Sequence, residues 1–386
     1  MADRWEALVG PAIVVDLQVM RDHAVVVRNE HIEAVVPISQ LPSDITIRHF
    51  GSGFLTAGLV DIHAHGAAGC GFNEGDIAGN AQALATLLQA GVTTVLPTLA
   101  TAPIENMTKG LEALSAVQGV SGFPHIPGAH LEGPFFAQAQ CGAQDPASLQ
   151  VPSDGTLDRL LEYSDIIQMI SFAPELPDAV ALTERLVAEG IVAAAGHSDG
   201  RAEDLFACQR VGLSHIIHVF SGQSTTIREG PWRHPGLLEA TLASDELTVE
   251  MIGDGKHLDS VLMKMAHRCL GDRLCLVSDS TPGAGMADGS RYRMGEIEYI
   301  VEDGVGMTLD RSAFAGSTTF VSAMIPIVIS ALGISLAEAV AMATSIPAKA
   351  ARLCDVGRIA KGFRADFTLF DAQMGVRAVA LSGEWK

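Results

Sequence analysis

Two histidines separated by one residue, His63 and His65, are the first residues in this sequence whose types and spacing suit metal chemistry. They end an apolar run, residues 59–65, that we expect to form a strand. Because side chains alternate between the two faces of a strand, both imidazoles would point to one side and could share a metal ion. Two structural histidines can have the same spacing, so the pair alone leaves the metal hypothesis open.

Further residues with ligand or acid–base chemistry stand at the corresponding place, where later apolar runs end: Glu132, His197, His218 and Asp279. If these runs are parallel strands of a barrel, their carboxyl ends meet on one face, so residues far apart in the sequence come together. Two or three neutral imidazoles beside a carboxylate suit Zn²⁺, and also Fe²⁺ or Mn²⁺. The sequence therefore predicts a divalent-metal site.

The elements that must position these residues are eight strand-like runs, most of them separated by helical patterns such as residues 80–90 and 203–211. This alternation predicts parallel strands with crossover helices, and eight such units fit a (β/α)8 barrel. An open, doubly wound sheet is the alternative, but no Gly-x-Gly-x-x-Gly follows the first strand. The predicted strands are residues 59–65, 92–98, 125–132, 166–172, 191–197, 214–220, 247–252 and 274–279.

Both ends of the chain have short strand patterns separated by turns. Neither end buries much surface alone, so we expect one small β-sandwich assembled from residues 1–57 and 358–386, beside a barrel of residues 58–357. The expected strands of the sandwich are residues 12–19, 24–27, 31–36, 45–50, 365–369 and 376–381.

The formal net charge of −20 argues against nucleic acid or an anionic membrane as a partner, and an anionic substrate would need a local cationic group. The six cysteines are scattered without a Cys-x-x-Cys pair, which favours reduced thiols in the cytoplasm. We expect no signal peptide and no membrane span, since no apolar run reaches about 18 residues.

Around these residues the chain resembles the amidohydrolase superfamily and, within it, the N-acetylglucosamine-6-phosphate deacetylases. The resemblance covers almost the whole chain, and the motif around Glu132 is its most specific part, because most of the superfamily bridges its metals with a carbamylated lysine. The matching segments are residues 58–66, 130–135, 196–198, 218–220, 252–257, 277–279, 315–317 and 362–366.

The resemblance implies that the chain hydrolyses N-acetylglucosamine 6-phosphate to glucosamine 6-phosphate and acetate, as a homodimer or a higher homo-oligomer. It implies that Glu132, His197 and His218 hold the main ion. His63 and His65 would hold a second ion together with Glu132, so that a subunit binds one or two. Asp279 would be the catalytic acid/base.

The chain departs from the family pattern on the substrate side. Ser221-Gly222-Gln223 stands where the family has Asn-Ala-Met, and Gln144 replaces a substrate-facing histidine. The loop of residues 137–146 lacks the usual lysines, and the segment around Arg228 and Arg233 is longer. The resemblance implies that Arg228 binds the phosphate, either of its own subunit's substrate or of a neighbouring subunit's. Arg233 has no counterpart in the family and belongs to the longer segment. The expected substrate-side residues are Gln144, Ser221, Gly222, Arg228, Arg233 and His257.

The chemistry can be stated without the family. A divalent ion lowers the pKa of its bound water from about 15.7 to near 7. Asp279 would accept the proton and pass it to the departing nitrogen, while the metal or His257 polarises the carbonyl. We expect structural roles for His215, packed against a helix, and for His130, near Glu132.

Three alternatives remain open at this point. The same metal site could open a cyclic amide or release ammonia. It could act on another acylamino sugar, such as N-acetylgalactosamine 6-phosphate or an unphosphorylated sugar. A barrel that has lost catalysis could also serve as an oligomeric scaffold.

Overall fold

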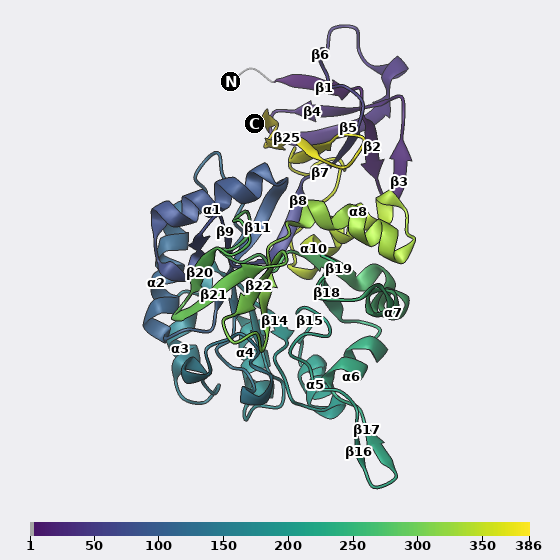
Figure 1. The fold of residues 1–386 in the computed structure, drawn as a ribbon. Coiled ribbons are helices and arrows are strands. Elements are labelled where there is room, and N and C mark those ends of the chain that lie inside the picture. Colours follow the sequence, from purple (N-terminus) through teal and green to yellow (C-terminus); the bar gives the residue numbers. More distant parts are fainter. Residues whose placement is uncertain (1–3) are drawn as a thin grey trace.

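The computed structural model describes residues 4–386, and its centre is an eight-stranded parallel barrel (Figure 1). The barrel is closed through Asp279, whose N–H donates to the carbonyl of His63 at 2.8 Å, and through a bridge between Ala64 and Ser280. The predicted (β/α)8 fold is therefore confirmed. In the order of the sheet, the strands are β8 (Leu59–Ala64), β11 (Val92–Ala100), β12 (Ala129–Glu132), β13 (Ile167–Phe172), β14 (Val192–Ala195), β15 (His215–Ile216), β18 (Thr248–Ile252) and β19 (Leu274–Val277).

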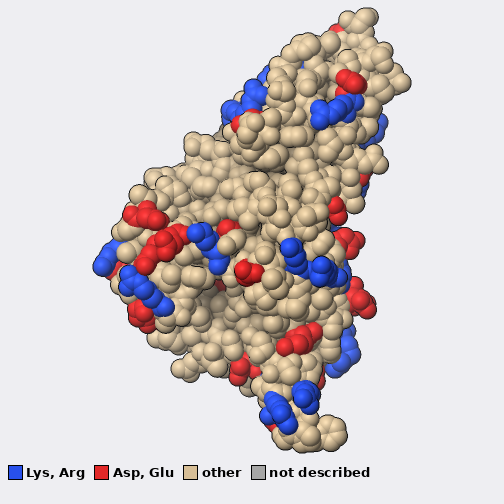
Figure 2. Space-filling view, turned by 45° about the vertical axis from the view of Figure 1, so that its right-hand side comes forward, with Lys and Arg blue, Asp and Glu red and all other residues tan. Residues whose placement is uncertain are grey.

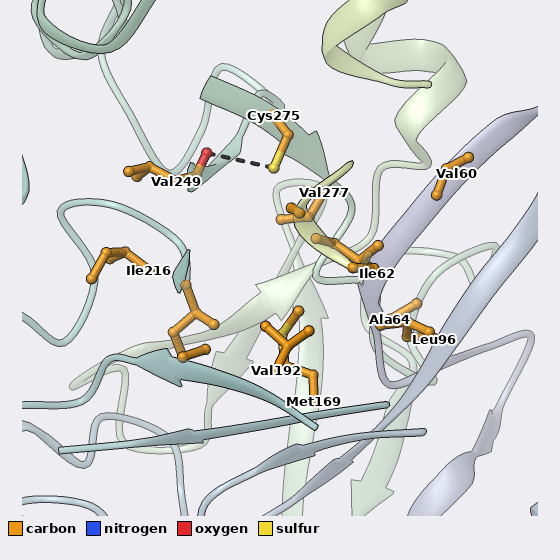
Figure 3. Packing of buried hydrophobic residues seen from close by; sticks show 14 of the residues in the cluster. Val60, Ile62, Ala64, Leu96, Met169, Val192, Ile216, Val249, Cys275 and Val277 are labelled. Carbon is orange, nitrogen blue, oxygen red and sulfur yellow. Dashed lines mark hydrogen bonds between the residues drawn. The ribbon is translucent and has the colours of Figure 1, made fainter. Parts of the chain in front are cut away.

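Helices cover the outside of the barrel, which explains why the strands are apolar on both faces. The apolar side chains of the strands pack closely, among them Met169, Val192 and Ile216 (Figure 3). Asp76 and Asp259 cap α1 and α7 by accepting a hydrogen bond from the second backbone N–H of each helix. The helices are α1 (Ile77–Gln89), α2 (Ile104–Val117), α3 (Thr156–Leu161), α4 (Ala179–Ala188), α5 (Ala202–Arg210), α6 (Leu237–Ala243), α7 (Ser260–Leu270), α8 (Val321–Leu332), α9 (Leu336–Met342) and α10 (Ser345–Ala350).

Two further sheets lie at one end of the molecule and contain strands from both the first and the last part of the described chain (Figure 1). The first contains β5 (His31–Pro37), β4 (His23–Arg28), β1 (Trp5–Val9) and β6 (Thr46–His49). The second contains β26 (Glu384–Trp385), β25 (Val376–Leu381), β24 (Phe367–Phe370), β7 (Phe54–Ala57), β2 (Ala12–Val15) and β3 (Gln18–Met20). The single strand expected over residues 12–19 is wrong, because Asp16 and Leu17 form a turn with positive φ. The domain limits stay a prediction.

Four antiparallel strands inserted after β19 were not expected: β20 (Arg291–Met294), β21 (Ile297–Glu302), β22 (Val305–Thr308) and β23 (Phe314–Ser317). The hairpin of β16 (Ile227–Glu229) and β17 (Trp232–His234) extends away from the barrel (Figure 1). Short strands β9 (Gly66–Ala67) and β10 (Cys70–Gly71) follow β8. Within residues 4–386 no helix is long and apolar enough to cross a membrane.

Candidate metal centre and catalytic cavity

The expected site residues lie at the carboxyl ends of the barrel strands, and three of these ends have unusual backbone conformations. His197, His218 and Asp279 adopt positive φ angles of 44°, 20° and 46°. Non-glycine residues rarely adopt this region, and such conformations concentrate at functional sites. The sequence predicted that His197 and His218 lie within strands 191–197 and 214–220. In the structure β14 ends at Ala195 and β15 ends at Ile216, so both histidines follow their strands.

Glu132 is the centre of the cluster. Its Oε1 lies 3.1 Å from His197 Nε2, 3.0 Å from His218 Nε2 and 3.7 Å from His63 Nε2. Its Oε2 lies 3.3 Å from Nε2 of His65. Burial raises the pKa of the Glu132 carboxyl, but the surrounding imidazoles outweigh it and hold that pKa well below its ordinary value.

Asp279 faces His63, which lies in β8, and His65, which directly follows β8. Its Oδ1 lies 3.6 Å from His63 Nε2 and 3.3 Å from His65 Nε2. Burial raises the pKa of its carboxyl, and the nearby histidines lower it further than burial raises it. Asp279 is therefore an ionised carboxylate beside the cluster.

The arrangement fits one or two divalent ions. Two ligands about 2.1 Å from a tetrahedral ion lie roughly 3.4 Å apart, close to the distances around Glu132. His63 Nε2 is fully buried and has no hydrogen-bond partner, a costly state that an ion would relieve. Atoms of His63, Glu132 and His218 form one group of suitable geometry, and atoms of His63, His65 and Asp279 form another.

A cavity of about 210 Å³ opens beside this cluster. His257 is positioned there by Asp254, whose carboxylate contacts its Nδ1 at 2.8 Å and accepts its backbone N–H at 2.9 Å. The inserted sheet contributes Phe314, whose ring lies 5.0 Å from that of His257. Of the predicted site residues, those that line the cavity are His65, Glu132, Gln144, His197, His218, Ser221, Gly222, His257 and Asp279.

Comparison with known proteins identifies the family. The model of the amidohydrolase family matches residues 54–386, and that of the NagA composite domain matches residues 7–51. The chain belongs to the amidohydrolase family. The resemblance inferred from the sequence is therefore confirmed, and with it a hydrolase that acts on an amide.

Three relatives illustrate the similarity of this amidohydrolase to known proteins. It is 30% identical over 385 residues to the N-acetylglucosamine-6-phosphate deacetylase of Haemophilus influenzae, covering 98% of this chain and 99% of that one. It is 30% identical to the N-acetylgalactosamine-6-phosphate deacetylase of a Shewanella species, covering 86% and 83%. The crystal structure of N-acetylglucosamine-6-phosphate deacetylase from Pasteurella multocida aligns with a TM-score of 0.91 at 27% identity, covering 99% of both chains.

Sequence reasoning missed Glu250, a fully buried carboxylate in β18 that contacts the histidines of this cluster from behind. Its oxygens lie 2.8 Å from His63 Nδ1 and 3.0 Å from His215 Nε2, and one accepts the N–H of His218 at 3.2 Å. His215 therefore bonds to Glu250 inside the barrel, which contradicts the expected packing against a helix. A glutamate in the middle of an apolar barrel strand was the available signal. His130 is also buried, 3.1 Å from Ser171 Oγ.

Arg228 and Arg233 do not reach the cavity of their own chain. They lie opposite each other on the exposed β16–β17 hairpin, where basic side chains are visible at the lower tip (Figure 2). Arg228 Nε donates to the carbonyl of Gly230 at 2.7 Å, and Arg233 Nη1 donates to that of Pro231 at 3.0 Å. Trp232, on the same hairpin, is also exposed.

Proposed function

We propose that this amidohydrolase removes the acetyl group of N-acetylglucosamine 6-phosphate, giving glucosamine 6-phosphate and acetate. The observation that carries the proposal is the convergence of four imidazoles on the Glu132 carboxylate, beside a cavity that Asp279 also lines. The names of the full-length relatives supply the class of substrate.

In this proposal Glu132, His197 and His218 hold the main ion, which we take to be Zn²⁺ because imidazole nitrogen and carboxylate oxygen are its common ligands. His63 and His65, with Glu132, would hold a second ion. When bound, such an ion supplies a water of lowered pKa and polarises the scissile carbonyl.

Asp279 and His257 perform the remaining chemistry. The Asp279 carboxylate accepts a proton from the attacking water and donates it to the amide nitrogen, since an amine leaves readily only when protonated. The Asp254 carboxylate accepts from His257 Nδ1, which leaves Nε2 as the ring nitrogen that can approach the acyl group; Nε2 donates to the acyl oxygen when the ring carries a proton on both nitrogens. Ser221, Gly222 and Gln144 would contact the sugar.

The phosphate requires a cation that the cavity itself lacks. None of the described residues that line it is a lysine or an arginine. We assign this role to Arg228 of a second copy, because an arginine can hold two phosphate oxygens and the hairpin extends outward. Arg233 would support it. The proposal therefore includes a homodimer or a higher homo-oligomer, which would work in the cytoplasm as the cysteines suggest.

A substrate panel tests the proposal. Acetate release is measured with N-acetylglucosamine 6-phosphate, N-acetylgalactosamine 6-phosphate and unphosphorylated N-acetylglucosamine, and ring opening is measured with a cyclic amide such as hydantoin. We expect the first to exceed the unphosphorylated sugar in kcat/KM by about 100-fold, the scale of one charge-assisted contact. Preference for the galactosamine derivative would change only the sugar assigned as the substrate, whereas turnover of the cyclic amide alone would overturn the proposed deacetylase activity.

A further inference from the structure

We propose that Gln144 is a positioning residue that holds the carboxylate of Glu132 in the orientation required by the main ion. The inference rests on the proposed function, in which Glu132 is a metal ligand. It assigns Gln144 a task beyond the sugar contact expected from its place in the sequence.

Both ends of the Gln144 amide are engaged. Its Nε2 donates a short hydrogen bond to Glu132 Oε2, and its Oε1 accepts the backbone N–H of Thr101 at 2.8 Å. If the amide were flipped, its oxygen would face the Glu132 carboxylate, another acceptor, and its NH₂ group would face the N–H of Thr101, another donor. Only one orientation of the amide therefore satisfies both partners. One N–H of the amide remains available to the cavity, which leaves room for a sugar contact as well.

The surroundings of Gln144 fix it in place. Thr101 directly follows β11, whose last residue Ala100 pairs with Glu132 of β12. The Thr101 hydroxyl donates to the Glu132 carbonyl at 3.1 Å. The neighbouring Ala143 carbonyl accepts the buried hydroxyl of Tyr299 at 2.6 Å. The loop that holds Gln144 is thus attached to the barrel on one side and to the inserted sheet on the other.

This arrangement distinguishes the two oxygens of Glu132. Oε2 accepts from the Gln144 amide and lies 3.3 Å from His65 Nε2, whereas Oε1 faces Nε2 of both His197 and His218. A carboxylate free to rotate would offer either oxygen to that pair. Holding the carboxylate in place before the ion binds removes an entropic cost of binding, as groups that orient metal ligands generally do.

The test measures ion affinity without substrate. Zn²⁺ dissociation constants are determined by chelator competition for wild type, Gln144→Met and Gln138→Met. The last is a matched control because Gln138 lies exposed in the same loop. We expect Gln144→Met to weaken binding by about 10- to 100-fold, the usual effect of losing a group that orients a metal ligand. Gln138→Met should not change it.

Each other result has a defined meaning. If Gln144→Met raises KM for the sugar, or lowers the free energy of unfolding, while the dissociation constant stays within about twofold of wild type, the inference is wrong. If Gln144→Met does not fold, Gln144→Asn replaces it, since its shorter amide cannot bridge Thr101 and Glu132. Glu132→Gln is measured in parallel: retained tight binding in that variant would overturn the proposed metal site itself, not only the role of Gln144.

Discussion

Replacing Glu250 with glutamine removes one negative charge from the interior while almost preserving shape. The Glu250 carboxylate is fully buried and accepts hydrogen bonds from His63, His215 and the backbone of His218. Burial raises the pKa of its carboxyl, but His63 and His215 lower it by more, so the folded protein holds the charged form.

The expected cost follows from those three contacts. A hydrogen bond to a charged group contributes about 1.5–3 kcal/mol and one between neutral groups about 0.5–1.5 kcal/mol, so each contact loses about 1 kcal/mol. Glu250→Gln should therefore lower the free energy of unfolding by about 3 kcal/mol. It should also weaken ion binding by about 10- to 100-fold, because Glu250 orients His63 from the side away from the cavity.

Urea denaturation of the chelator-treated protein measures the first effect, and chelator competition measures the second. Glu298→Gln is the control, since Glu298 forms only an exposed ion pair with Arg291 at 3.1 Å, and such pairs contribute little. A loss of less than about 0.5 kcal/mol in Glu250→Gln, equal to that of the control, would refute the argument that this buried charge holds the histidines in place.

Further predictions concern the reaction itself. Asp279→Asn should lower kcat by about 10²- to 10⁴-fold with metal content nearly intact, and a variant within about threefold of wild type would exclude the acid/base role. Glu132→Ala should lose the tightly bound ion in elemental analysis, and stoichiometric metal with turnover would contradict the ligand assignment. His63→Asn/His65→Asn should bind fewer ions than wild type if a second site exists; equal content argues against it. Arg228→Met should reduce kcat/KM for the phosphorylated sugar by a factor that corresponds to about 2–4 kcal/mol of lost transition-state stabilisation, and it should leave kcat/KM for the unphosphorylated sugar unchanged. Equal losses for both sugars would exclude the phosphate role.

The sequence was sufficient to predict the barrel because its strands are apolar runs separated by helical segments, and the carboxyl ends of parallel barrel strands all meet on one face. It was not sufficient for the inserted sheet of residues 291–317, whose alternating pattern was assigned to the barrel region. Glu250 was missed because a single carboxylate within a strand gives no spacing pattern, and its partners His63 and His215 come from other strands. The turn at Asp16 was missed because only Asp16 and Gln18 interrupt the apolar residues of the segment 12–19, which was taken as one strand.

Apart from Gln144, the departures from the family pattern fall on parts of the chain that can change without disturbing the cluster around Glu132. Glu132 and His63 belong to strands whose hydrogen-bond ladders fix their backbone, so a shift there would distort the barrel. Ser221 lies in a loop, and Arg228 lies on a projecting hairpin; such segments tolerate substitution and carry specificity on a rigid scaffold. The identity of the sugar can therefore differ from that of the relatives while amide hydrolysis is retained. For this reason the substrate panel, more than any metal analysis, decides which member of the deacetylase group this chain most resembles in activity.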